Sequence, residues 1–93
     1  MASSPKSKLR INPAVFTRKS GKTWIILGRD KSYYRQLSEV AGFIWLLLKI
    51  PRSIPEITDC LVKNYDVSSQ EARKDTEDFI EEYVRLGLLI KSN

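Results

Sequence analysis

Residues 19–27 have the sequence KSGKTWIIL, and this stretch decides how the first third of the chain folds. Gly21 can adopt the positive φ that a tight hairpin needs, so a turn is predicted there. Residues 23–27 follow as a strand that ends in four consecutive apolar side chains. Because side chains alternate between the two faces of a strand, this strand offers apolar surface to both sides of a sheet.

Short β-like segments flank this strand on both sides. Residues 9–11 alternate apolar and polar side chains, and residues 15–18 contain β-branched and aromatic ones. A second turn is predicted at residues 28–32, followed by a short extended piece at 33–37. The first half of the chain therefore predicts a small antiparallel sheet, a three-stranded meander with residues 24–27 in its edge strand.

From residue 38 onward, apolar side chains recur every three or four positions, which predicts helices. A first helix follows the candidate N-cap Ser38 and ends before Pro51, because proline disfavours helical geometry in the preceding residue. Ser53 and Glu56 have the spacing of a capping box for a second helix. A third, longer helix ends at Gly87. The sequence thus predicts an α+β fold of winged helix-turn-helix type, a three-stranded antiparallel sheet followed by three helices.

Length and composition are those of one small globular domain, with 93 residues, 42% of them apolar and 29% charged. We expect residues 1–7 to form a flexible basic tail and residues 8–93 to form the domain. The tail lacks the apolar stretch of a signal peptide, and no apolar run approaches the ~20 residues of a membrane-spanning helix. A single cysteine cannot form an internal disulfide, so we expect a cytoplasmic protein.

The net charge of +5 is unevenly distributed. Residues 1–52 carry eleven Lys and Arg against two acids, whereas residues 53–93 carry five against nine. The third helix of a DNA-binding winged helix enters the major groove, and its six acids here would face phosphates of like charge. DNA binding through that helix is therefore disfavoured. Contact between RNA and the basic hairpin stays open, as does simple solubilising charge at Arg18, Lys19, Lys22, Arg29 and Lys31.

The side chains that catalysis or metal binding would need are missing or isolated. The chain has no histidine, the commonest general base and metal ligand. Cys60 falls on the apolar stripe of the second helix, so we expect a buried thiol. The acids of the third helix match the solvated face of an amphipathic helix, and no glycine-rich phosphate loop is present. We therefore expect a binding protein, without metal or cofactor, rather than an enzyme.

Two explanations of the apolar strand stay open. The helices and the tyrosines at 33 and 34 can bury residues 24–27 on both faces. Alternatively the strand is an open edge to which a peptide adds as a further strand, since no charge, proline or bulge blunts it between Thr23 and Gly28.

Several segments, in their order and spacing, resemble the PqqD-like proteins. They are residues 9–13 (LRINP), 24–32 (WIILGRDKS), 33–37 (YYRQL), 44–45 (IW), 54–57 (IPEI), 65–67 (YDV), 79–80 (FI) and 86–89 (LGLL). The likeness spans about residues 8–91. Such RiPP recognition elements bind the leader segment of a ribosomally made precursor peptide and present it to modifying enzymes. The segment at 33–37 is most similar to free-standing members from lasso-peptide pathways, which implies a leader-peptide protease and a macrolactam-forming cyclase as partners.

The resemblance also implies a binding groove between the third strand and the third helix. On this sequence it implies that the leader pairs with the backbone of Thr23, Trp24, Ile25, Ile26, Leu27 and Gly28. The other wall is then expected from the third-helix residues Asp75, Phe79, Glu82, Tyr83 and Leu86, which fall on one side of a helix. Asp75 or Glu82 can meet a basic leader residue. Phe79 and Tyr83 can receive leader side chains or belong to the ordinary core.

Three functional hypotheses result. The first is an adaptor that binds a lasso-peptide leader by β-strand addition and raises its effective concentration at the enzyme. The second is a nucleic-acid-binding winged helix that acts through its basic hairpin. The third is a recognition element of another RiPP class, such as pyrroloquinoline quinone or a radical-SAM-modified peptide.

Overall fold

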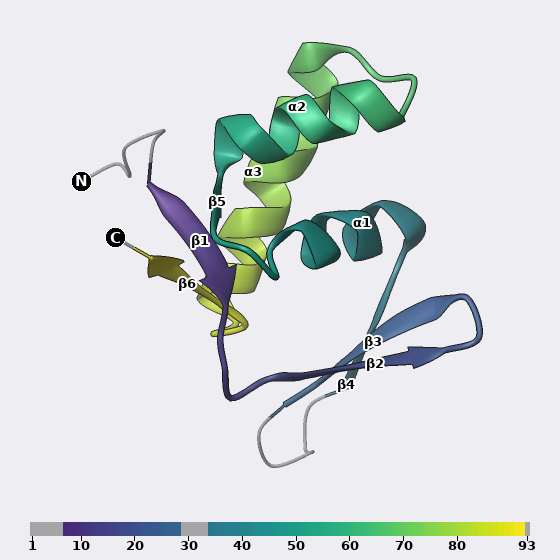
Figure 1. Cartoon of the computed structure of the whole chain (residues 1–93), viewed down its shortest axis with the longest axis vertical. Helices are drawn as coiled ribbons and strands as arrows, with labels where there is room; N and C mark the ends of the chain where they lie inside the picture. Colours follow the sequence, from purple (N-terminus) through teal and green to yellow (C-terminus); the bar gives the residue numbers. More distant parts are fainter. Residues whose placement is uncertain (1–6, 29–33, 93) are drawn as a thin grey trace.

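The computed structural model describes residues 7–28 and 34–92 (Figure 1). Within them, six strands form two three-stranded sheets, and three helices complete the fold. One sheet has the order β5-β1-β6 and the other the order β2-β3-β4. The elements are β1 (Lys8–Ile11), β2 (Phe16–Ser20), β3 (Thr23–Leu27), β4 (Tyr34–Leu37), α1 (Glu39–Leu47), β5 (Arg52–Ser53), α2 (Ile54–Asn64), α3 (Ser69–Arg85) and β6 (Leu89–Ser92).

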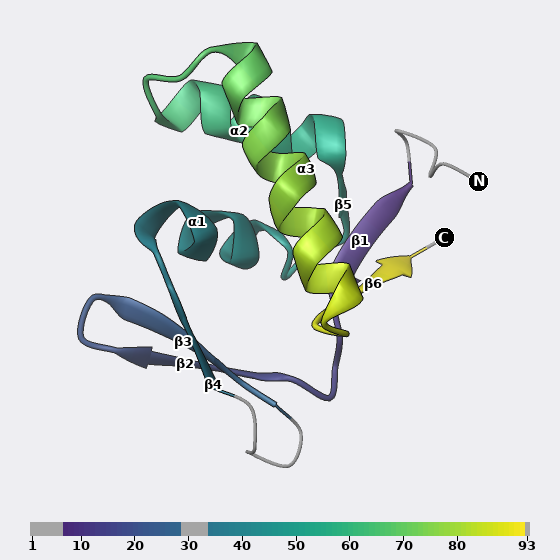
Figure 2. The ribbon, with the colours of Figure 1, turned by 180° about the vertical axis from the view of Figure 1, so that it is seen from behind.

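The predicted fold class is confirmed, since the antiparallel β2-β3-β4 sheet precedes three helices. In both ribbon views α1 lies between this sheet and α2 (Figures 1 and 2). The predicted hairpin turn is also present, with Gly21 at φ 62° between β2 and β3. None of the helices in the described part of the chain combines the length and the apolarity that crossing a bilayer requires.

β3 is the middle strand of its sheet, not an edge. All of its residues pair with β2, and residues 24–27 pair with β4 as well. The prediction of an edge strand at residues 24–27 is therefore wrong, and so is the expected addition of a peptide along residues 23–28. The structure supports the other explanation, a covered strand, because Ile25 and Ile26 are buried.

Pairing with the next strand along the chain and pairing over a long sequence distance together explain this difference. Residues 34–37 form a full strand on the open side of β3, where the sequence suggested only a short extended piece. β1, expected to open the same meander, pairs instead with β5 and with β6 at the far end of the chain. The side-chain amide of Asn12 donates to the Gly87 carbonyl oxygen at 2.9 Å and fastens this second sheet to the end of α3.

The predicted helix N-caps Ser38 and Ser53 are confirmed, and Ser68 caps α3 in the same way. Ser38, Ser53 and Ser68 each accept a hydrogen bond from the backbone N–H three residues on, which satisfies a donor that has no partner within the helix. At α2 the capping box is complete, because Glu56 accepts from the backbone N–H of Ser53 at 2.8 Å. This hydrogen bond holds the pKa of the Glu56 carboxyl below its ordinary value.

The core is built from all three helices together with β1, β3, β4 and β6. Ile26 and Trp45 are fully buried, and the indole Nε1–H of Trp45 donates to the Thr17 hydroxyl at 2.8 Å, which ties α1 to β2. Gly42 lets α1 approach the sheet closely, because a Cβ atom there would lie 3.1 Å from Trp24 Cδ1. Cys60, expected to be buried, is only half-buried.

The bond between Trp45 and Thr17 gives a test of this packing. Replacing Thr17 by valine keeps the shape but leaves the buried indole N–H without its acceptor, so we expect the free energy of unfolding to fall by about 1–3 kcal/mol. Chemical denaturation measures the change. The matched control is Thr23→Val, a half-buried threonine of the neighbouring strand, which should stay within about 0.5 kcal/mol of wild type. Equal losses in the two variants would contradict the assigned role of this bond.

Candidate functional site

Among the described residues, no strand pairs with the outer side of β4 or of β2. Their backbone N–H and C=O groups on those sides are therefore open to a further strand. The two edges differ in charge. β2 exposes Arg18 and Lys19 in succession, the kind of charge that blunts an edge, whereas the one charged side chain of β4, Arg35, is engaged with α3. β4 is thus the better edge for strand addition.

Arg35 connects β4 to α3 through three contacts. Its Nη2 donates to Glu82 Oε2 at 2.6 Å, and its Nε donates to the Tyr83 hydroxyl at 3.1 Å. The guanidinium carbon also lies 5.0 Å from the centre of the Tyr83 ring, a cation–π distance. Arg35 shares its face of the strand with the buried Leu37, because alternate side chains point the same way. The helix-covered face of β4 is therefore held against the flank of α3 that carries Glu82.

The sequence left two roles open for Phe79 and Tyr83, contact with the leader or membership of the core. Their burial supports membership of the core. Their rings stack with centroids 3.9 Å apart, and the Tyr83 ring also lies 6.0 Å from that of Trp45. Phe79 is 8% exposed and Tyr83 3%. Both rings therefore form the wall of the core beneath this flank of α3.

The other three α3 positions expected at the site are accessible. Asp75 is exposed, Glu82 is half-buried against Arg35, and Leu86 is 41% exposed at the helix end. At 100° per residue the three fall on one side of the helix, and the contact between Glu82 and Arg35 shows that this side faces β4. We call the outer edge of β4 together with these three residues the β4–α3 surface. The role of these residues in peptide binding stays a prediction.

The residues expected on β3 do not form the open side of this surface, because β4 lies beyond them in the sheet. Ile25, Ile26 and Gly28 are buried, and the remaining ones are half-buried. The Trp24 ring makes two cation–π contacts, because the ammonium groups of Lys19 and Lys49 lie 5.4 and 5.9 Å from its centre. Trp24 also lines a cavity of about 480 Å³ at the end of β4, together with Leu37.

Sequence reasoning missed Arg35 as a site residue. The signal that could have identified it was the predicted turn at residues 28–32. A strand that follows a hairpin turn pairs with the strand before it, so residues 33–37 had to cover the open side of residues 24–27. Within the described residues, no group of three or more His, Cys, Asp or Glu side chains could hold a metal ion.

Comparison with known proteins identifies the family and the fold of the chain. The family model for coenzyme PQQ synthesis protein D (PqqD) matches residues 23–89. A solved structure described as TbiB1 in complex with the TbiA(beta) leader peptide is 26% identical, with a TM-score of 0.78 over 86% of this chain and 93% of that one. A second, a lasso peptide synthetase B1 complexed with the leader peptide, shares the fold at 20% identity, with a TM-score of 0.79 over 88% and 96% of the two chains. No curated protein matches the chain.

The contact between Arg35 and Glu82 can be measured by a double-mutant cycle on stability. Since these side chains are only 32% and 40% exposed and their bond is short, we expect Arg35→Met and Glu82→Gln to show a coupling energy of about 1 kcal/mol. The control pair is Lys74 and Asp78, 76% and 65% exposed on the same helix, for which about 0.3–0.5 kcal/mol is expected. A coupling no larger than that of the control pair would show that the ion pair with Glu82 does not help to hold β4 to α3.

Proposed function

The chain belongs to the PqqD family and has the fold of a PqqD-like RiPP recognition element, and from this premise we propose that it binds the leader segment of a ribosomally made precursor peptide. The open outer edge of β4 beside α3 is the single observation that carries the proposal. An extended leader adds to this edge as a fourth strand of the β2-β3-β4 sheet. Main-chain hydrogen bonds then supply affinity that does not depend on the leader sequence, and side chains supply specificity.

Specificity comes from the flank of α3 that faces β4. Leu86 offers an exposed apolar contact, and the exposed carboxylate of Asp75 favours a basic leader side chain, since Glu82 is already paired with Arg35. Phe79 and Tyr83 act from beneath, because their stacked rings fix the position of the helix wall rather than contact the leader. Arg35 remains bound to Glu82 and Tyr83 and holds the two sides of the surface at a fixed separation.

A lasso-peptide pathway is the setting we favour among the RiPP classes. The two solved relatives were determined with leader peptides bound, and the second is described as a lasso peptide synthetase. In such a pathway the chain itself performs no chemistry. It delivers the leader to a protease and a macrolactam-forming cyclase by raising the effective concentration of the precursor at those enzymes.

The structure gives less support to nucleic-acid binding. The exposed face of α3 carries carboxylates, including Asp75, Asp78 and Glu81, that would meet phosphates of like charge. Of the basic hairpin residues, Lys19 lies against Trp24. We therefore do not propose nucleic acid as the partner.

The proposal is tested by titrating the protein with a fluorescent leader of the precursor peptide from the same pathway. We expect a Kd below about 50 µM for wild type. Leu86→Glu should weaken binding about tenfold or more, because it places a charge on the apolar contact. The matched control is Val62→Glu on α2, where the side chain is 37% exposed against 41% at Leu86, and it should bind as wild type does.

Either of two results would contradict the proposal. The first is a wild-type protein that shows no binding to the leader at about 50 µM. The second is leader binding that Leu86→Glu and Val62→Glu reduce equally, which would place the leader elsewhere on the domain. Thermal melts of both variants confirm that each is folded.

A further inference from the structure

β4 presents its side chains to both faces of the β2-β3-β4 sheet. Arg35 and Leu37 point toward the helices, since Arg35 binds α3 and Leu37 belongs to the core. Gln36 lies between them in the strand and therefore points to the opposite face, where it is exposed. The register pairs Gln36 with Ile25, and Ile25 with Arg18 of β2. These three residues form one row across the sheet, with Gln36 at the open edge.

The face that carries this row, which we call the outer face, comprises Phe16, Arg18, Ile25, Leu27 and Gln36. In both ribbon views the three helices lie on the other side of this sheet (Figures 1 and 2). Ile25 is only 9% exposed but does not belong to the core cluster, and Phe16 is 57% exposed. Among the described residues, no helix or strand therefore covers the outer face, which is open as far as the edge of β4.

α3 can contact only one face of a leader strand that is added to β4. Alternate side chains of a strand point to opposite faces of the sheet. Leader side chains that point toward Leu86 and Asp75 therefore leave their sequence neighbours on the outer face. Contacts with these outward side chains must come from elsewhere in the domain.

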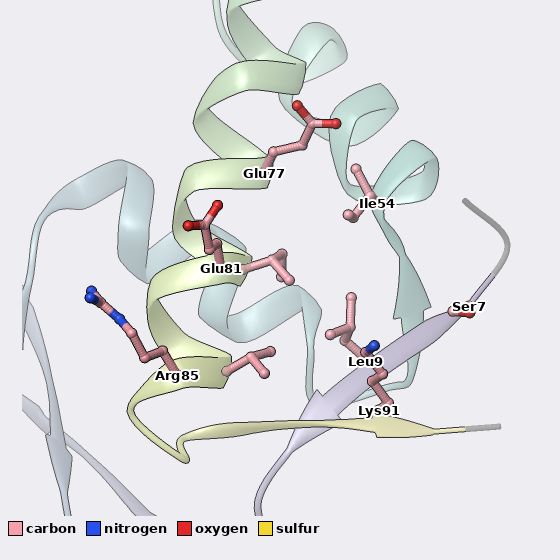
Figure 3. Close-up of a pocket in the computed structure, with 9 residues that line it drawn as sticks. Ser7, Leu9, Ile54, Glu77, Glu81, Arg85 and Lys91 are labelled. Carbon is pink, nitrogen blue, oxygen red and sulfur yellow. The ribbon is translucent and has the colours of Figure 1, made fainter. Parts of the chain in front are cut away.

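A cavity of about 360 Å³ lies on the opposite flank of α3, between this helix and the β5-β1-β6 sheet (Figure 3). Leu9 of β1 and Val84 of α3 line this cavity over β1. Two residues that are two positions apart in a helix point about 160° away from each other, so Val84 points away from Leu86. A leader on β4 does not reach this cavity, and the outer face is the surface that its outward side chains meet.

We propose that Gln36 selects the leader residue that lies opposite it, and that this residue has a hydrogen-bonding side chain. The inference rests on the proposed binding of a leader along β4. Side chains directly opposite each other in neighbouring strands have Cβ atoms about 4.5–5.5 Å apart, so Gln36 is the first outer-face side chain that the leader meets. Its amide can donate and accept, and within the described part of the chain it has no hydrogen-bond partner.

The surroundings of Gln36 explain why its partner is polar. On one side its neighbour in the row is Ile25, whose side chain offers no hydrogen bond, so the amide can bond only toward the open edge. An added strand removes water from that edge. A hydrogen-bonding leader side chain replaces the lost water, whereas an apolar one leaves the amide without a partner and disfavours binding. The leader is thus selected on one face by α3 and on the other by Gln36.

The test is an alanine scan of the leader, titrated against wild type and against Gln36→Leu, which keeps the size of the side chain and removes its amide. We expect one leader position at which alanine weakens binding to wild type about threefold or more and leaves binding to Gln36→Leu unchanged. The native residue at that position should carry a hydroxyl, amide or charged group. The matched control is Gln70→Leu, the same substitution at an exposed residue in the first turn of α3, which should reproduce the wild-type scan.

A third scan, against Leu86→Ala, tests the alternation of the two faces. Leader positions that lose their effect in this variant point toward α3. We expect an odd number of residues to separate them from the position coupled to Gln36, because neighbours along a strand point to opposite faces. Thermal melts confirm that each variant is folded.

Three results would overturn the inference. The scans of wild type and Gln36→Leu are identical, the position coupled to Gln36 carries an apolar residue, or an even number of residues separates it from the positions coupled to Leu86. A wild-type protein that does not bind the leader would refute the proposed function and this inference with it. Binding of the leader without coupling to Gln36 would refute this inference alone.

Discussion

The pairing of β3 on both of its sides is the constraint on which the rest of the structure depends. Because β2 and β4 use all the backbone groups of residues 24–27, the apolar side chains of this strand are fixed in direction. Ile26 is fixed in the core beneath Trp45, and Trp24 against Gly42 of α1. The same pairing moves the open edge of the sheet outward to β4, where a partner strand can reach it.

α3 is the second organising element, since it borders both the β4–α3 surface and the cavity over β1. The buried side chains of α3 belong to the core, and its two flanks contact different parts of the structure. The Glu82 flank is tied to β4 through Arg35, whereas the Val84 flank borders the cavity over β1. Of the acids of this helix, Asp75 and Glu82 lie on the flank toward β4, Glu77 and Glu81 line the cavity, and Asp78 pairs with Lys74 on the exposed face.

Local features could be predicted from the sequence, and features set by distant pairing could not. The turn at Gly21 and the caps at Ser38 and Ser53 are confirmed, because each depends on residues within four positions. The place of β3 in the sheet depends on which strands pair, and alternation of side chains is the same for an edge and a central strand. β1 pairs with β6 some eighty residues away, from Lys8↔Ser92 onward, which no local pattern signals. Arg35, which contacts Glu82 and Tyr83 from β4, was missed for another reason: its strand pairs with the preceding strand, and the turn predicted between them already indicated that pairing.

The central claim is that a leader peptide adds to the outer edge of β4. Amide hydrogen exchange, measured by NMR with and without leader, tests it most directly. Since alternate amides of a strand point to opposite sides, the account predicts new protection at every second residue of Tyr34–Leu37 and none along Phe16–Ser20. Protection gained along the β2 edge, or binding without any change in β4, would contradict it.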